Sequence, residues 1–281
     1  MSTHPILVIG GTGITGRRVA ARLADRGLPV ATASRSGDRR FDWTDDTTWD
    51  AALDGVRGAY VVSLDGTVGL TAALVERAEA RGLERVVLLS ARGIDIPGHY
   101  GDDSMAAAGH LDAERAVRAS GLEWTILRPG WFIQNFTEGI FRDELTETGE
   151  LRIPAGDGAT PYIDAGDIAD VAVAALTGDG HAGRTYELSG PRPLTVAEAL
   201  AEVSAATGRP ARYTPVSPEE YIDGLVAAGV DPVTAKIYDE GLHPVRTGGE
   251  ARVSDGVERA LGRPPRDFAA AVRADLEAAR G

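Results

Sequence analysis

The segment that most constrains the fold is an apolar run, residues 6–9, that leads directly into a turn with glycines at positions 10, 13 and 16. In a strand–turn–helix unit, glycines at this spacing permit a tight turn, close approach of the backbone to a pyrophosphate, and packing of the helix on the strand. The helix N-terminus then offers free N–H groups to phosphate oxygens. The chain has 35 glycines in 281 residues, so the spacing alone is weak evidence. The strand before it and the helix after it favour a dinucleotide site over an ordinary glycine-rich turn.

Strand-like and helix-like segments alternate along the first two-thirds of the chain, which is typical of βαβ units and a parallel sheet. Gly27, Gly82 and Gly121 each follow a predicted helix and precede a predicted strand, as a helix C-cap does. We therefore predict an α/β fold with a Rossmann-type doubly wound parallel sheet in a domain of residues 1–190. The predicted strands lie near 5–9, 29–34, 59–63, 84–89, 124–128 and 184–188, with a short strand before residue 42, and the predicted helices cover 17–26, 69–81, 110–120 and 167–176.

After about residue 191 the pattern changes to successive helices with little strand character. The predicted helices cover 195–207, 218–228, 232–240 and 267–279. We predict a small, mainly helical lobe over residues 191–281. Because ligands of open α/β sheets bind beyond the carboxyl ends of the strands, such a lobe would cover a substrate site.

Composition narrows the class of protein. The chain has no cysteine, which excludes disulfides, thiolate metal sites and thiol catalysis, and its histidines show no metal-ligand spacing, so we predict no metal. A net charge of −13 disfavours binding to nucleic acid. No apolar run approaches the roughly 20 residues that span a bilayer. We expect a cytoplasmic protein with a small-molecule substrate and no membrane or nucleic-acid partner; the oligomeric state stays undetermined.

The residues after the second predicted strand indicate which dinucleotide is bound. An NAD(H) site usually places an acidic residue there to bind the ribose 2′-hydroxyl. This chain has Ser34 and Arg35 instead. The guanidinium of Arg35, with that of Arg17, could pair with a 2′-phosphate, so NADP(H) is favoured over NAD(H). Asp42 is placed at the adenine edge, whereas the neighbouring Trp43 could equally belong to the core.

Several motifs together resemble one family. They are Gly10-Gly-Thr-Gly-Ile-Thr-Gly-Arg17, His110-Leu-Asp-Ala-Glu114, the run 120–135 that contains Arg128-Pro-Gly-Trp-Phe132, Tyr162-Ile-Asp-Ala-Gly-Asp-Ile-Ala-Asp170, Ser189-Gly-Pro191, Thr195-Val-Ala-Glu198 and Gly208-Arg209. The chain is similar over nearly its whole length to the NmrA-like group of atypical short-chain dehydrogenases. That resemblance implies an NADPH-dependent reductase of quinones, imines or enones, or an NADP(H)-binding redox sensor without catalysis. The predicted cofactor-binding residues are Gly10, Thr12, Gly13, Ile14, Thr15, Gly16, Arg17, Ser34, Arg35, Asp42, Ser63, Ser90 and Pro129.

The chain departs from ordinary short-chain dehydrogenases in its chemistry. Those enzymes use a Tyr-x-x-x-Lys pair on one helix face to exchange a proton with an alcohol or carbonyl. Here the single lysine is Lys236, in the predicted lobe, and the helix that should carry the pair has His110 and Glu114. This departure indicates a substrate that is already electrophilic, because a quinone or an iminium ion accepts hydride with little help from an acid.

The catalytic candidates are His110, Glu114 and Tyr100. His110 and Glu114 lie four residues apart and share a helix face, so His110 could donate a proton while Glu114 orients it. Alternatively, Glu114 caps the helix or pairs with Arg115 or Arg118 on a solvated face, and His110 only packs. Tyr100, in a glycine-rich loop, is a rival acid.

Aromatic residues after the strand at 124–128 indicate a substrate pocket. We predict that Trp131, Phe132, Asn135 and Tyr162 line it, and that Asp167 caps the next helix. The favoured function is an NADPH-dependent oxidoreductase, and the alternative is a redox sensor that binds NADP(H) and signals through a protein partner.

Overall fold

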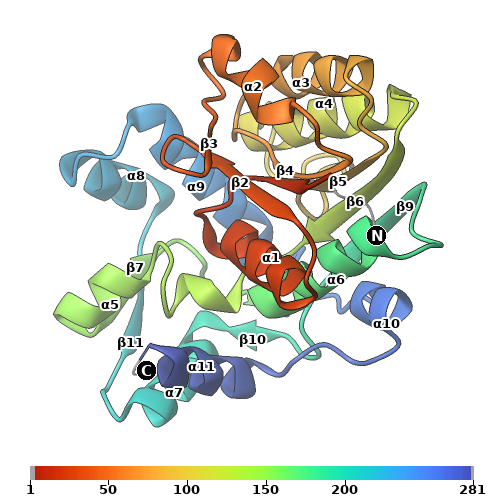
Figure 1. The fold of residues 1–281 in the computed structure, drawn as a ribbon. Helices are drawn as coiled ribbons and strands as arrows, with labels where there is room; N and C mark the ends of the chain where they lie inside the picture. Colours follow the sequence, from red (N-terminus) through yellow and green to blue (C-terminus); the bar gives the residue numbers. More distant parts are fainter. Residues whose placement is uncertain (1–3, 280–281) are drawn as a thin grey trace.

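The computed structural model describes residues 4–279, which form a central sheet covered by helices and a lobe at one edge (Figure 1). Residues 1–3 and 280–281, which belong to the predicted domains 1–190 and 191–281, lie outside the described residues. Seven parallel strands form the sheet in the order β3-β2-β1-β4-β5-β6-β9. The predicted Rossmann-type sheet is confirmed, and its six longer strands lie within one residue of the predicted bounds. The strands are β1 (Ile6–Ile9), β2 (Val30–Ser34), β3 (Arg39–Arg40), β4 (Gly58–Val62), β5 (Arg85–Leu89), β6 (Glu123–Pro129) and β9 (Arg184–Leu188).

Helices cover both faces of the sheet (Figure 1). Strand β1 shows why its sequence is continuously apolar: Leu7 and Ile9 join the cluster on one face, whereas Ile6 and Val8 join the cluster on the other. Successive side chains of a strand point to opposite faces, so a strand buried on both faces needs apolar residues throughout. One face is covered by α1 (Ile14–Asp25) and α6 (Ala165–Thr177), and the other by α2 (Trp49–Leu53), α3 (Leu70–Ala80) and α4 (Met105–Ala119), with the 3₁₀ turn η1 (Asp46–Thr48) before α2.

Three helices begin earlier than predicted: α1 begins at residue 14 instead of 17, and α4 and α6 begin early because other residues cap them. Helix α4 begins at Met105, where the Ser104 hydroxyl accepts a hydrogen bond from the Ala107 N–H. Helix α6 is capped by Asp164, whose carboxylate accepts a hydrogen bond of 2.9 Å from the Gly166 N–H. The predicted cap at Asp167 is therefore wrong, since Asp167 lies in the first turn of the helix.

A third apolar cluster forms the core of the lobe. It includes Phe268 and Val272 of the helical C-terminal region, which is confirmed, together with Ile133 and Phe136 from the chain after β6. The cluster therefore joins residues on both sides of position 190, the predicted boundary. Its elements are η2 (Ile133–Asn135, a 3₁₀ turn), α5 (Arg142–Thr148), β7 (Glu150–Ile153), β8 (Ala159–Thr160), β10 (Leu194–Thr195), α7 (Val196–Thr207), β11 (Arg212–Pro215), α8 (Pro218–Ala227), α9 (Pro232–Arg246) and α11 (Phe268–Ala278).

The lobe contains short strands that the sequence pattern did not indicate. Strand β7 pairs in parallel with β11, and β8 pairs antiparallel with β10. Helix α10 (Gly256–Leu261) packs on α6 and β9 rather than on the lobe. The chain after α9 thus returns to the sheet before it ends in α11.

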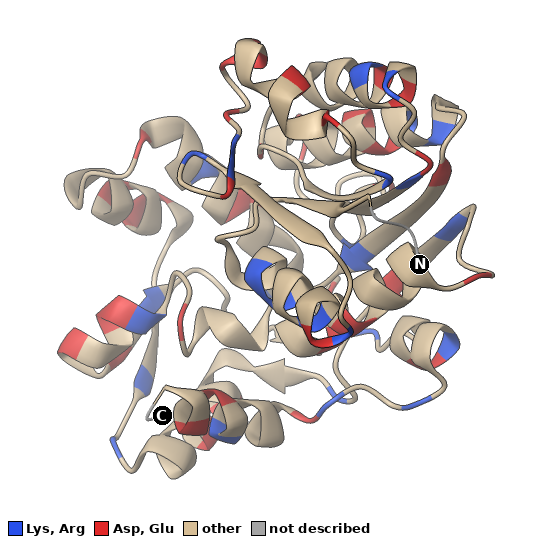
Figure 2. Ribbon diagram, in the orientation of Figure 1, with Lys and Arg blue, Asp and Glu red and all other residues tan. Residues whose placement is uncertain are grey.

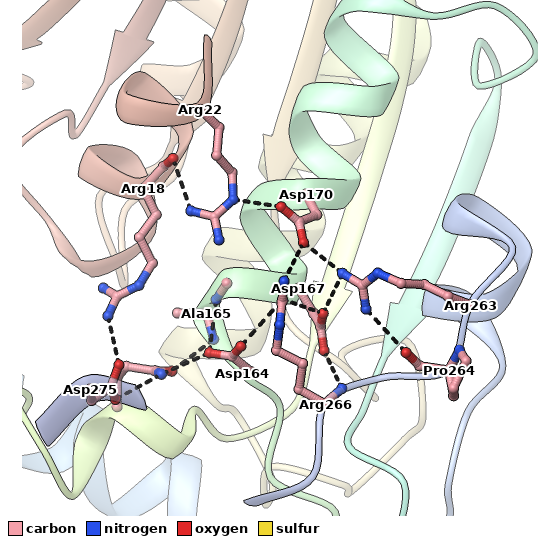
Figure 3. Close-up of polar contacts among 12 residues, drawn as sticks. Arg18, Arg22, Asp164, Ala165, Asp167, Asp170, Arg263, Pro264, Arg266 and Asp275 are labelled. Atoms are coloured by element: carbon pink, nitrogen blue, oxygen red, sulfur yellow. Dashed lines mark hydrogen bonds and ion pairs between the residues drawn. The ribbon is translucent and has the colours of Figure 1, made fainter. Parts of the chain in front are cut away.

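Ion pairs fasten this returning segment to the helices of the sheet (Figure 3). Asp167 is fully buried and accepts hydrogen bonds from the Arg266 backbone N–H at 2.7 Å and from its guanidinium at 2.6 Å. Asp170 accepts bonds from Arg22 of α1 at 2.5 Å and from Arg263 at 2.6 Å. Burial raises the pKa of the Asp170 carboxyl, but the bonds from Arg22 and Arg266 outweigh it and hold that pKa below its ordinary value.

Charged residues otherwise gather on the outer helices and loops, and β1 and β4 carry none (Figure 2). Within residues 4–279, no helix combines the length and the apolar character that crossing a bilayer requires.

Candidate functional site

The glycine turn has the geometry of a phosphate cradle. Gly10 adopts a positive φ of 78°, and its N–H donates to the Ala33 carbonyl at 3.0 Å. A Cβ on Gly16 would lie 2.1 Å from the Gly10 carbonyl oxygen, so only glycine fits there. Gly13 is the N-cap of α1 and supplies no side-chain hydrogen bond, which leaves the first N–H groups of the helix open to an anion. These residues fit a dinucleotide pyrophosphate.

This turn opens into a cavity of about 740 Å³ that runs along the carboxyl ends of β1, β4, β5 and β6 and continues to the lobe. Its walls are mainly apolar. The cavity therefore joins the predicted cofactor turn to the predicted substrate pocket. The predicted cofactor-binding residues that line it are Gly10, Thr12, Gly13, Ile14, Thr15, Ser63, Ser90 and Pro129.

The predicted adenosine-binding residues lie outside this cavity, at the end of β2. Arg35 is exposed there next to Ser34, and within residues 4–279 it forms no ion pair. The Asp42 carboxylate accepts hydrogen bonds from the N–H and hydroxyl of Thr44, and these bonds, with the charges of Arg35 and Arg40, lower its pKa. The guanidinium of Arg35 is thus open to a ligand, whereas Asp42 is engaged in its own turn.

Arg17 and Gly16 belong to α1 and do not line the cavity. The Arg17 guanidinium forms an ion pair with Glu138, and the neighbouring Arg18 also contacts Glu138, at 2.6 Å. Glu138 follows η2, so this pair links the cofactor turn to the lobe. The sequence analysis missed Glu138 because 121 residues separate it from Arg17 and no local pattern marks it.

Glu114 is a partner of Arg128, and the prediction that it orients His110 is wrong. Its buried carboxylate accepts hydrogen bonds from Arg128 at 2.7 and 2.8 Å, from the Ser90 hydroxyl at 2.7 Å, and from Arg118 at 3.2 Å. Burial opposes the ionisation of Glu114, but the bonds from Arg128 and Ser90 dominate and lower its pKa. The carboxylate therefore acts as a structural anchor beneath Ser90. The alternative of a pair with Arg115 or Arg118 on a solvated face agrees only in the bond from Arg118, because the carboxylate is buried.

His110 lines the cavity without a hydrogen bond to Glu114. Its Nε2 lies 3.7 Å from the Asp65 carboxylate, and its buried Nδ1 has no hydrogen-bond partner within residues 4–279. Burial lowers the pKa of His110 below its ordinary value, against the opposing charges of Asp65 and Glu114. The imidazole thus lies in the cavity wall, and neither of its ring nitrogens is engaged in a hydrogen bond within residues 4–279.

Tyr100 lines the cavity, but its proton is engaged elsewhere. Its hydroxyl donates to the Arg92 carbonyl at 2.7 Å. Burial, assisted by the charge of Glu250, raises the pKa of Tyr100 well above its ordinary value. Both observations disfavour Tyr100 as the acid relative to His110.

Of the four residues predicted for the substrate pocket, three line the cavity. Trp131, Phe132 and Asn135 line the cavity, and the Trp131 indole N–H donates to the Gly241 carbonyl at 3.1 Å. Tyr162 does not line it. Its ring is buried in the lobe core between Phe136 and Phe268, with centroids 5.2 and 5.6 Å away. The prediction for Tyr162 is therefore wrong, because tertiary packing placed this aromatic residue in the core.

The sequence analysis missed several residues of the cavity wall. They come from the loop after β4, the chain after η2, helix α9 and the loop before α10, and none belongs to a recognisable motif. They include Asp65, Ile140, Ile237, Tyr238 and Glu250.

Comparison with known proteins agrees with this architecture. A family model described as NAD(P)H-binding matches residues 10–179. The (4-alkanoyl-5-oxo-2,5-dihydrofuran-3-yl)methyl phosphate reductase of Streptomyces griseus is 34% identical, over 94% of this chain and 95% of its own. The NAD(P)H azoreductase of Xenophilus azovorans is 32% identical, over 97% of this chain and 98% of its own. In fold, the chain matches the NADPH-dependent quinone oxidoreductase of Escherichia coli complexed with NADPH, with a TM-score of 0.75 at 23% identity over 96% and 99% of the chains. The chain belongs to the NAD(P)H-binding, NmrA-like family of atypical short-chain dehydrogenases/reductases.

Proposed function

We propose that this protein is an NADPH-dependent reductase that transfers hydride to a small activated acceptor, namely a quinone, an imine or iminium ion, or an enone. The observation that carries the proposal is the continuous cavity from the glycine turn to the aromatic wall at Trp131 and Phe132. A nicotinamide held by the turn and a planar acceptor held by the aromatic wall would share one largely apolar space. The relatives named as reductases of a dihydrofuranone phosphate and of azo compounds support a reductive reaction.

The choice of NADPH rests on Arg35. The 2′-phosphate distinguishes NADPH from NADH, and a guanidinium matches phosphate geometry. Arg35 is exposed at the carboxyl end of β2, where the adenosine ribose binds in this fold. When bound, the cofactor supplies a hydride to the acceptor.

The choice of an activated acceptor rests on the acids that the cavity presents. Lys236 lies on α9, with its side chain 58% exposed and 3.9 Å from Glu240, and it does not line the cavity. Tyr100 donates its proton to a backbone carbonyl. An iminium ion needs only the hydride, whereas a quinone or an enone takes up the hydride and one proton. His110 is the group we assign to that proton.

The test is NADPH oxidation, followed by the loss of absorbance at 340 nm, with a panel of quinones, imines, iminium ions and enones, and with reactions lacking the protein as blanks. We expect turnover with at least one of these classes. NADPH binding, measured by its fluorescence, without oxidation by any acceptor would contradict the proposal and favour the redox sensor.

A further inference from the structure

Glu250 brings a buried carboxylate to the substrate end of the cavity. It lies in the loop between α9 and α10, which folds back over the ends of β5 and β6. Its side chain is 3% exposed, yet the residue lines the cavity together with Tyr100 and Gly130. A Cβ built on Gly130 would lie 3.9 Å from Oε2 of Glu250, which places that oxygen against the cavity wall.

The two oxygens of this carboxylate have different surroundings. Oε1 lies 2.9 Å from Nε2 of His99 and forms a hydrogen bond with it. Oε2 lies 3.6 Å from Nη1 of Arg92, beyond hydrogen-bond distance, and has no hydrogen-bond partner within residues 4–279. Buried carboxylate oxygens are almost always hydrogen-bonded, because desolvation otherwise disfavours the charge. Nη1 of Arg92 is likewise without a hydrogen-bond partner among the described residues, so this contact leaves the oxygen's need for a donor unmet. An unpartnered carboxylate oxygen in a residue of the cavity wall is therefore suited to a donor on the ligand.

The charged residues that line the cavity also favour a ligand that donates hydrogen bonds over an anionic one. Among residues 4–279, no lysine or arginine lines the cavity, whereas two carboxylates do, those of Glu250 and Asp65. Arg92 balances the charge of Glu250 from behind the wall, where it also donates to the Arg252 carbonyl. An anionic acceptor, bound away from the helix N–H groups of the glycine turn, would therefore meet carboxylates in the cavity without a cation to pair with.

We propose that Glu250 is a specificity-determining residue: its Oε2 accepts a hydrogen bond from a hydroxyl, N–H or protonated amine on the acceptor substrate, and the carboxylates of Glu250 and Asp65 exclude anionic acceptors. This inference rests on the proposed reductase function. It narrows the substrate to an activated acceptor that carries a hydrogen-bond donor and is neutral or cationic.

The test uses three naphthoquinones that differ in one substituent at position 2 of 1,4-naphthoquinone. The hydroxymethyl compound carries a donor, the methoxymethyl compound lacks it, and the sulfonate is an anion. At saturating NADPH we expect kcat/KM for the hydroxymethyl compound to exceed that for the methoxymethyl compound by about tenfold, in line with the loss of one hydrogen bond to a charged group. In Glu250→Gln this ratio should fall several-fold, mainly through KM, because the lost contact holds the substrate in the ground state.

Two further variants keep the test decisive. Glu258→Gln removes an exposed carboxylate of α10 outside the cavity and should leave the ratio unchanged. Asp65→Asn, at a side chain that is 60% exposed, should raise kcat/KM for the sulfonate several-fold without changing the hydroxymethyl preference. Equal ratios in the wild type and Glu250→Gln, or a preference of the wild type for the sulfonate, would overturn the inference.

A binding measurement separates this inference from the reductase function. The same three compounds are titrated calorimetrically into wild-type and variant proteins loaded with NADP⁺. If no acceptor oxidises NADPH, the reductase proposal fails, and the order of the three dissociation constants still decides the role of Glu250. Should Glu250→Gln not fold, the wild-type order and the effect of Asp65→Asn on sulfonate binding decide it.

Discussion

The two ends of the cavity are built in different ways. The cofactor end is a single stretch of backbone, residues 10–16, in which glycines allow close approach and the helix N-terminus supplies the donors. The other end, where we propose that the substrate binds, is built from side chains that come from separate parts of the chain, such as Tyr100, Trp131, Ile237 and Glu250. A site made of backbone depends on the absence of side chains and tolerates few substitutions. A site made of side chains can change its ligand by single substitutions while the fold remains.

The largest effect is expected where the two ends meet, beneath Ser90. Glu114→Ala removes the partner of the buried Arg128 and should lower the free energy of unfolding by about 3–5 kcal/mol. Glu76→Ala on the exposed side of α3 is the control and should change it by less than about 0.5 kcal/mol. Chemical denaturation at pH 7 measures both. If Glu114→Ala lowered the free energy of unfolding as little as the control does, the Glu114–Arg128 pair would not be the contact that stabilises the region where the two ends meet.

The pH dependence of the same variant follows from the lowered pKa of Glu114. Because the folded pKa lies below the unfolded one, the ionised carboxylate stabilises the protein above the ordinary value of 4.5, and this stabilisation is lost as the pH falls through the folded pKa. The difference in free energy of unfolding between the wild type and Glu114→Ala should therefore reach its full value at pH 7 and become smaller below about pH 4.5. A constant difference down to pH 3 would contradict this.

The next largest effect tests whether the cofactor end really depends on bare backbone. Gly16→Ala places a Cβ 2.1 Å from a carbonyl oxygen that cannot move aside, and should cost about 1–3 kcal/mol of stability and weaken NADPH binding. Gly224→Ala in α8 is the matched control, because nothing lies within 4 Å of its Cβ, and it should stabilise by about 0.5–1 kcal/mol. Thermal unfolding and NADPH fluorescence measure both. Equal behaviour of the two variants would remove the distinction between the ends.

The same contrast explains what could be predicted from the sequence. The strands and the glycine turn are local features, and they predicted the sheet and the glycine-turn residues that line the cavity. The pair Arg17–Glu138, the position of Glu250 and the burial of Tyr162 depend on packing between distant segments. An aromatic residue after a strand has the same sequence signal in a pocket as in a core, so Trp131 lines the cavity as predicted, whereas Tyr162 lies in the core.

A smaller effect is expected at the adenosine position. Arg35→Glu replaces the proposed partner of the 2′-phosphate by a like charge and should weaken NADPH by on the order of tenfold to a hundredfold, with little change for NADH. Arg142→Glu on the exposed α5 makes the same change in net charge and should leave both affinities nearly unchanged. Fluorescence titrations with the two cofactors measure this. Equal losses for NADPH and NADH would contradict the role of Arg35.

The smallest effect is expected for His110→Ala, because an activated acceptor needs little help from an acid. With a quinone we expect kcat to fall by about tenfold or less, below the usual range for general acid catalysis, while the NADPH affinity is retained. Burial lowers the pKa of His110, so the protonated form grows as the pH falls, and the wild-type kcat with a quinone should rise toward acidic pH while that of His110→Ala stays flat. An iminium ion takes up no proton, so its turnover should be the same in both proteins and serves as the matched control. An equal loss with both acceptors would mean that His110 shapes the cavity and donates no proton.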